Sequence, residues 1–177
     1  MNQAGDKVLL YGFGNPGRGD DGLGPALAEA IEALAMPGVS VDANYQLTVE
    51  DAAEMGQYQA VLFADAAADG PSPFWFSRID DSGVGRLGWT SHSVTPVQVV
   101  ALARDLFGSK VAAYVLGIRG YSFGELDDGL SAPARDNLAQ ALAFARRALD
   151  ERRFEQYVQE FGYPAAGIGA GGTTWKA

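Results

Sequence analysis

The sequence predicts an α/β protein: a three-layer α/β/α sandwich with a mostly parallel or mixed central sheet of about five strands. Short apolar runs rich in β-branched and aromatic residues alternate with segments of helical periodicity along the 177 residues. The first run, at 8–11, is followed directly by glycine, as expected for a buried parallel strand. The chain is long enough for a core of its own, and we expect one domain at 1–164 and a disordered, glycine-rich tail at 165–177.

The boundaries of the expected elements follow the changes in periodicity. Leu27, Ile31 and Leu34 are spaced by four and three residues, which indicates an amphipathic helix that ends before Pro37-Gly38. In chain order, we expect a helix at 25–36, a strand at 39–45, a short helix from a capping-box-like 48–51 to Gly56, a strand at 58–65, an edge strand or hairpin at 74–79, a helix from the Thr95 cap to about Phe107, a strand at 111–118, and a long helix from the Ser131 cap to about Arg153.

Composition excludes several classes of function. The net charge of −9, without a basic stripe, argues against a nucleic-acid partner, since phosphate binding depends on clustered Lys and Arg. The chain has no cysteine, which excludes disulfides, Cys-ligated zinc, iron–sulfur clusters and a thiol nucleophile. We find neither a signal-peptide core nor an apolar run of about 18 residues that would span a bilayer. We therefore expect a cytoplasmic protein with no membrane partner.

The glycine-rich stretch at 12–24 is the first candidate for chemistry, because ligands of open α/β sheets bind beyond the carboxyl ends of the strands. It carries two adjacent carboxylates, Asp20 and Asp21. It also matches the G-x-G-x-x-G pattern of dinucleotide-binding folds, with Asp42 as a candidate ribose acid. That interpretation is disfavoured because Pro16 lies inside the motif and the helical pattern begins too late for the pyrophosphate to meet a helix N-terminus.

Three polar residues are expected on the same rim of the sheet. Asp21 follows the first strand, Asp65 closes the third, and His92 precedes a helix. Two carboxylates and an imidazole form a three-ligand site for a divalent transition metal, with positions left open for water or substrate. The spacing alone also fits a capping Asp21, a strand-ending Asp65 and a surface His92, so both interpretations stand at this point.

Other catalytic motifs are incomplete. Gly120 to Gly124 match the G-x-S-x-G nucleophile elbow, but that fold needs a His after the Ser and the only His of the chain precedes it. Asp81-Ser82-Gly83 resembles the aspartic-protease triplet, and the chain offers no second copy for a dyad. Zinc protease signatures need two His residues one helical turn apart, which a single His excludes.

The chain resembles the hydrogenase maturation endopeptidases, which trim the C-terminal extension of the large subunit of nickel hydrogenases. The resemblance spans Lys7 to about Leu149 and is most specific at 12–15 and 19–24, with the strand ending in Asp65 and the Ser91-His92 loop before a helix. Leu116-Gly117-Ile118 and Leu130-Ser131 resemble the last strand and the last helix start of the family. The resemblance implies a phosphorylase/hydrolase-like sandwich and an endopeptidase that activates its hydrogenase.

The resemblance also implies roles for individual residues. The metal-binding and catalytic triad falls on Asp21, Asp65 and His92, while Asn15 and Asp20 would contact the substrate or support the ligands. The first position is often Glu in the family, so Asp21 is one methylene shorter. Nickel would arrive with the hydrogenase large-subunit precursor, so no tightly held cofactor is expected, and the enzyme would act as a monomer. The resemblance leaves the cleavage chemistry open among a metal-polarised carbonyl, a metal-activated water and a carboxylate base.

Two rival functions remain. The Gly14-Asn15-Pro16-Gly17 turn also resembles peptidyl-tRNA hydrolase, but Asp20-Asp21 stand where its catalytic His should fall, and such an enzyme would need a basic surface. A non-catalytic, nickel-sensing maturation chaperone would bind the precursor without cleaving it and would keep the triad. The sequence identifies neither the hydrogenase that is processed nor the peptide that is released.

Overall fold

A computed structural model describes residues 7–81, 94–124 and 129–163. Its centre is a five-stranded sheet in the order β2-β1-β3-β5-β4. The strands are β1 (Val8–Phe13), β2 (Val39–Asn44), β3 (Ala60–Ala67), β4 (Phe74–Arg78) and β5 (Ala112–Arg119). Neighbouring strands are parallel, except that β4 runs antiparallel to β5 at one edge. The predicted mixed sheet, with an edge strand near 74–79, is therefore confirmed.

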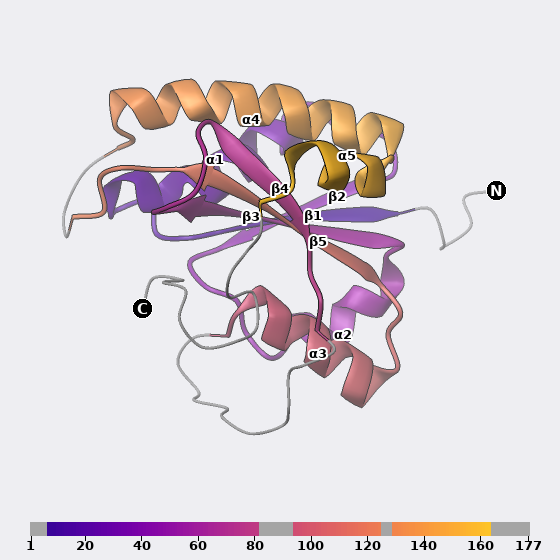
Figure 1. Ribbon diagram of the computed structural model, residues 1–177. Helices are drawn as coiled ribbons and strands as arrows, with labels where there is room; N and C mark the ends of the chain where they lie inside the picture. The colour runs from indigo at the N-terminus through magenta and orange to yellow at the C-terminus, as the bar shows by residue number, and fades with distance from the viewer. Residues whose placement is uncertain (1–6, 82–93, 125–128, 164–177) are drawn as a thin grey trace.

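Helices cover both faces of the sheet, as Figure 1 shows. One face carries α1 (Leu23–Glu32), α4 (Ala132–Glu151) and α5 (Phe154–Phe161), and the other carries α2 (Asp51–Glu54) and α3 (Pro96–Phe107). Two 3-10 turns, at Gly19–Gly22 and Met55–Gln57, adjoin α1 and α2. In the described ranges, every helix is too short or too polar to cross a membrane. The architecture is the three-layer sandwich that the sequence predicts.

The alternation of side chains along β3 creates a hydrophobic core on each face. Leu62 and Ala64 pack with α1 and α4, while Val61 and Phe63 pack with α2 and α3. Every residue of β3 is buried, which is why the sequence shows a continuous apolar run there rather than an alternating pattern.

The third strand extends further than predicted. The sequence places Asp65 at its C-terminal end, but β3 continues to Ala67 because its last three residues pair with Gly117, Ile118 and Arg119 of β5. Asp65 therefore lies inside the strand, and the prediction of its position was wrong by two residues. The consequence is that the backbone around Asp65 is held by the sheet on the β5 side.

The helix that begins after Ser131 is shorter than predicted and is followed by a second helix. α4 ends at Glu151, since Arg152 adopts a left-handed conformation with a φ of 56°. The chain then enters α5, which buries Phe154 and Tyr157. This element was not predicted. The first helix also differs, because α1 begins at Leu23, ahead of the predicted Pro25, and ends at Glu32 rather than Met36.

The topology has a switch point between β1 and β3, and in open α/β sheets the strand ends at such a point border a crevice. From β1 the chain passes through α1 to β2 on one side, then through α2 on the opposite face to β3 on the other side. At such a switch point the connections leave in opposite directions, and ligands of open α/β sheets bind outside the strand ends there. The residues that follow β1 and those near the end of β3 are thus the ones to inspect for function.

Candidate functional site

Two glycines between the end of β1 and the first turn of α1 are packed so closely that neither could be replaced by a residue with a side chain. A Cβ on Gly24 would lie 2.4 Å from the carbonyl oxygen of Ala64 and 2.5 Å from that of Phe13. Gly14 has a φ of +140°, and a Cβ there would lie 2.0 Å from the carbonyl oxygen of Asp21. These contacts hold the start of α1 against the carboxyl ends of β1 and β3.

This close packing places Asp21 beside the crevice. Its Oδ2 accepts a hydrogen bond of 3.0 Å from the backbone N–H of Asn15. The Asn15 side chain in turn accepts one of 2.9 Å from the N–H of Gly17. Asp21 is half-buried at the rim of the sheet. Asn15 thus contacts Asp21 through its backbone and shapes the turn through its side chain.

Asp65 approaches the same crevice from β3. Its side chain lies on the face that carries α2 and α3, because it shares the alternation of Val61 and Phe63. Only 8% of its surface is exposed, and its Oδ1 accepts a hydrogen bond of 2.7 Å from the N–H of Ala66. The structure therefore brings Asp21 and Asp65 to the adjoining ends of neighbouring strands, one carboxylate partly exposed and one buried.

The third predicted ligand, His92, lies outside the described residues. After it, Val94 forms an antiparallel bridge with Leu47. Thr95 then closes a capping box with Gln98 at the start of α3. α3 covers the sheet face that Asp65 occupies. Among the residues that the structure describes, we find no group of three His, Cys, Asp or Glu side chains that could hold a metal ion. The triad remains a prediction.

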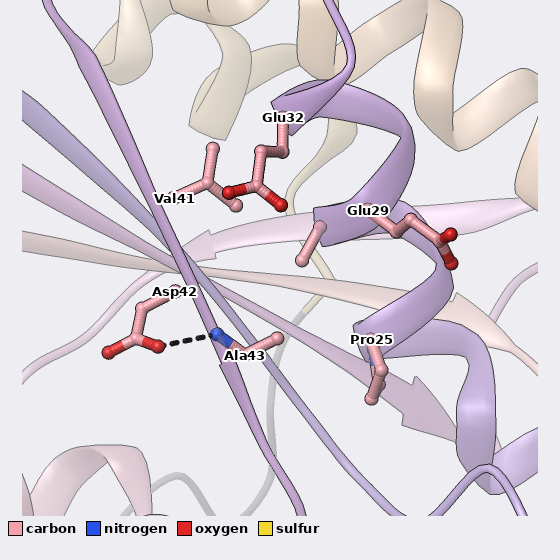
Figure 2. Close-up of a pocket in the computed structure, with 7 residues that line it drawn as sticks. Pro25, Glu29, Glu32, Val41, Asp42 and Ala43 are labelled. Carbon is pink, nitrogen blue, oxygen red and sulfur yellow. Dashed lines mark hydrogen bonds between the residues drawn. The ribbon is translucent and has the colours of Figure 1, made fainter.

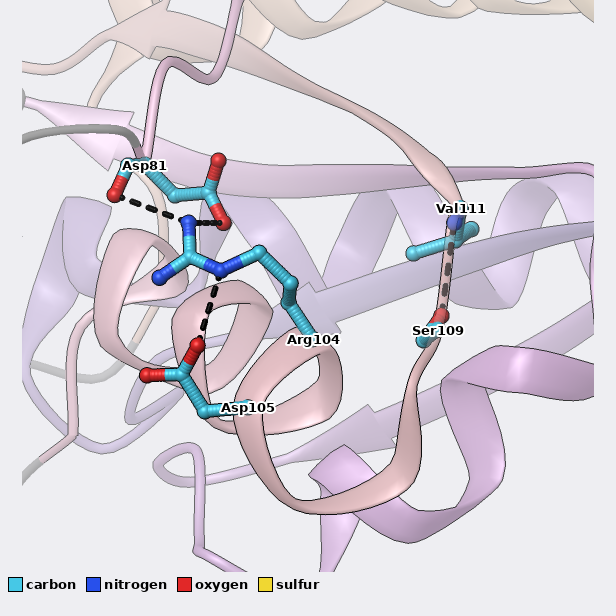
Figure 3. A network of polar contacts seen from close by, with 5 residues as sticks. All are labelled: Asp81, Arg104, Asp105, Ser109 and Val111. Atoms are coloured by element: carbon cyan, nitrogen blue, oxygen red, sulfur yellow. Dashed lines mark hydrogen bonds and ion pairs between the residues drawn. The ribbon is translucent and has the colours of Figure 1, made fainter.

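Asp81, the last described residue before the segment that contains His92, is hydrogen-bonded to Arg104 of α3 (Figure 3). The Arg104 guanidinium donates to the Asp81 carbonyl oxygen at 3.1 Å and to the Asp81 carboxylate at 2.6 Å, and its Nε donates to Asp105 at 2.9 Å. The hydrogen bond to Asp105 raises the pKa of Arg104 most, and the negative charges of Asp81 and Asp105 raise it further, while partial burial acts to lower it. The described residues on either side of 82–93, Asp81 and Val94, therefore both lie next to α3.

Asp20 has a different environment from its neighbour Asp21. It is fully buried and accepts hydrogen bonds from the N–H groups of Tyr121, Ser122 and Ser131 at 2.7, 2.9 and 2.7 Å, and from the Ser131 hydroxyl at 2.8 Å. Burial acts to raise the pKa of Asp20, but these hydrogen bonds outweigh it and lower the pKa below 3.8. Asp20 therefore stays ionised inside the protein and joins three segments of the chain.

The G-x-S-x-G motif belongs to this Asp20 cluster rather than to a nucleophile elbow. The N–H of Ser122 donates to the Asp20 carboxylate, and its carbonyl oxygen accepts a hydrogen bond of 2.8 Å from the Asp20 N–H. Residues 121–124 are not helical, whereas an elbow passes directly from strand to helix. The rejection of this motif on sequence grounds agrees with the geometry.

A groove between α1 and β2 lies beside the turn (Figure 2). It is lined by Pro25, Ala28, Glu29, Glu32, Val41, Asp42 and Ala43. Asp42, the candidate ribose acid, is exposed there and accepts a hydrogen bond of 2.8 Å from the N–H of Ala43. A 3-10 turn also separates β1 from α1, so the tight strand-to-helix passage of a dinucleotide site is absent from this part of the chain.

Comparison with solved structures places this fold among known proteins. The [NiFe] hydrogenase maturation protease HycI from Thermococcus kodakarensis KOD1 matches with a TM-score of 0.64 and 20% identity, over 82% of this chain and 93% of that protein. The hydrogenase maturating endopeptidase HybD from E. coli matches with a TM-score of 0.64 and 20% identity, over 83% of this chain and 94% of that protein. The hydrogenase 2 maturation peptidase from a Thaumarchaeota archaeon matches with a TM-score of 0.60 and 24% identity, over 81% of this chain and 98% of that protein.

At these identities the comparison establishes a shared fold. No protein-family model matches the chain, and no curated protein is significantly similar in sequence. The match covers most of this chain and nearly the whole length of the three matched proteins.

Proposed function

We propose that this chain is a hydrogenase maturation endopeptidase. It removes the C-terminal extension of a nickel hydrogenase large-subunit precursor after nickel insertion, and it recognises the nickel carried by that precursor through Asp21, Asp65 and His92. The observation that carries this proposal is the placement of Asp21 and Asp65 at the adjoining carboxyl ends of β1 and β3, in a fold shared with proteases of this function.

The chemistry of the three side chains fits this role. Carboxylate oxygen and imidazole nitrogen both bind divalent transition metals, and three protein ligands leave coordination positions for groups of the precursor. Such a site holds a free ion weakly, which suits an enzyme that meets its metal on the substrate. Each molecule would then supply part of one coordination sphere around the nickel.

The two carboxylates differ in a way that suggests separate tasks. Asp65 is buried and held by strand backbone on the β5 side, which suits a ligand whose position must be fixed. Asp21 is half-buried at the rim, so of these two nickel ligands it is the better placed to accept, in addition, a proton from an attacking water. This assignment favours a water-mediated cleavage with Asp21 as the base.

A processing assay tests the proposal. The pure protein is incubated with nickel-loaded and with nickel-free precursor, and the released C-terminal peptide is measured. We expect cleavage only of the nickel-loaded form, and loss of cleavage in Asp21→Asn and His92→Ala. Asp150→Asn on the exposed surface of α4 is the matched control and should cleave normally. Equal cleavage of nickel-free precursor would contradict the proposal, and binding without cleavage would identify a nickel-sensing chaperone instead.

A further inference from the structure

Trp75 on β4 has a buried donor without an acceptor. The side chain is 6% exposed, and its indole N–H finds no hydrogen-bond partner among the residues that the structure describes. An indole nitrogen can only donate, and burying it without an acceptor is unfavourable. Buried polar groups are nearly always paired, so such an exception calls for a physical explanation.

The pairing of strands puts this donor in the same row as Asp65. Asp65 of β3 pairs with Gly117 of β5, and Gly117 pairs with Trp75 of β4. Residues directly opposite each other on neighbouring strands project to the same face. Asp65 and Trp75 therefore stand on one face of the sheet, separated by a single residue.

The residue between them has no side chain, and the indole occupies that space. A Cβ on Gly117 would lie 2.2, 2.4 and 2.6 Å from Cε2, Cζ2 and Nε1 of Trp75. The ring thus leans from β4 across β5, with its nitrogen-bearing edge over Gly117. A Cβ on Gly70 would lie 3.1 Å from both Cδ1 and Nε1, so the Gly70 backbone also confines the indole. The side of the ring over Gly117 is the one that adjoins β3.

We propose that Trp75 is a positioning residue for Asp65. Its indole N–H donates to the Asp65 carboxylate when that carboxylate binds the nickel of the precursor, so the inference rests on the proposed function. Carboxylates that bind metals are generally held by hydrogen bonds from surrounding groups, which fix their orientation. Ala66 already donates to one oxygen of Asp65, and the indole adds a donor from the direction of β5. The donor that is costly in the free enzyme gains its acceptor in the complex.

Trp75→Phe removes the N–H and keeps an aromatic ring. We expect the affinity for nickel-loaded precursor, measured by calorimetry, to fall about 10–100-fold, as for other residues that support metal ligands. The affinity for nickel-free precursor should not change. In an Asp65→Asn background, the same replacement should have no further effect, because the residue through which Trp75 acts is gone. Urea unfolding of each variant verifies that it is folded.

The outcomes separate this inference from the proposed function. If the unmodified protein cleaves nickel-loaded precursor and Trp75→Phe binds it with equal affinity, the inference is wrong and the function stands. If the unmodified protein neither binds nor cleaves that precursor, the function fails and the inference fails with it. Should Trp75→Phe not fold, the indole N–H resonance of the unmodified protein decides. It should move downfield when nickel-loaded precursor is added, and an unchanged resonance would overturn the inference.

Discussion

The Asp20 carboxylate accepts hydrogen bonds from both the N–H and the hydroxyl of Ser131, at 2.7 and 2.8 Å. Ser131 is also the N-cap of α4, where its hydroxyl accepts from the N–H of Ala134. The turn after β1 is thereby fastened to the start of the longest helix. Since Asp21 follows Asp20 directly, this anchor also fixes the backbone of the proposed ligand.

Asp20→Asn should destabilise the protein at neutral pH. An amide offers one acceptor oxygen where the carboxylate has two, and its NH2 group would face the N–H donors of Tyr121, Ser122 and Ser131. We expect a loss of about 1–3 kcal/mol in the free energy of unfolding, measured in urea, because buried donors lose their acceptor. Asp150→Asn, on the surface of α4, should leave that free energy unchanged.

The stabilisation by Asp20 should disappear in acid. The pKa of Asp20 in the folded protein is lowered below its ordinary value of 3.8, so the ionised form stabilises the fold above that pH. As the pH falls through the lower, folded-state pKa, the carboxylate takes up a proton and its contribution is lost. Urea unfolding of the unmodified protein and of Asp20→Asn should therefore converge as the pH is lowered below 3.8. A constant difference would show that the charge of Asp20 is unimportant.

Replacing Asp21 should separate ligand type from ligand length. Asp21→Glu keeps a carboxylate and adds one methylene, so we expect it to retain processing of nickel-loaded precursor. Asp21→Asn removes the charge and should abolish processing, while its melting temperature stays close to that of the unmodified protein because Asp21 is half-exposed. Loss of processing in both variants would indicate that the position tolerates only the shorter carboxylate.

Much of the fold could be predicted because many helices and strands are specified by residues that are close together in the sequence. The caps of α3 and α4, at Thr95 and Ser131, are confirmed, since a cap and the helix it starts are neighbours in the sequence. The partners of Asp20 could not be found in this way, because Tyr121 and Ser131 are 101 and 111 residues away. The role proposed for Trp75 could not be predicted either, since its relation to Asp65 depends on the register of three strands.

The start of α1 should not tolerate a larger residue at Gly24. A Cβ there would contact two backbone carbonyl oxygens, at 2.4 and 2.5 Å, which cannot move without displacing β1 or β3. We expect Gly24→Ala to lower the free energy of unfolding, measured in urea, by about 3 kcal/mol or more, which is the upper end of the usual range for overpacking. Gly56→Ala is the control, because the nearest atoms to a Cβ at that position lie 3.9 Å away. Equal stability of the two variants would mean that the turn adapts.

α5 should contribute to stability although it was not predicted. Phe154 is 6% exposed and its ring lies 5.2 Å from that of Tyr114 between centroids, while Tyr157 lies 5.4 Å from Phe144. Phe154→Ala should lower the free energy of unfolding by about 3–5 kcal/mol, as for other buried aromatic residues. The exposed Gln159→Ala should have little effect. The aromatic residues of α5 recur at helical spacing, and this pattern could have revealed the helix from the sequence.

Arg104 connects α3 to Asp81, the last described residue before the segment that contains His92. Arg104→Gln removes the hydrogen bonds to both the carbonyl and the carboxylate of Asp81, and so frees Asp81 from α3. Stability should change little, because Arg104 and its carboxylate partners are partly exposed and such ion pairs contribute weakly.

Processing should be affected more than folding in this variant. If His92 must meet the nickel beside Asp65, loosening the segment should raise the KM for nickel-loaded precursor while nickel-free precursor stays uncleaved. Asp105→Asn is the matched control, since it removes the other partner of Arg104 and leaves the contact with Asp81 in place. The KM of each variant is measured in steady-state processing of nickel-loaded precursor. An unchanged KM in Arg104→Gln would mean that the position of His92 does not depend on the contact between Arg104 and Asp81.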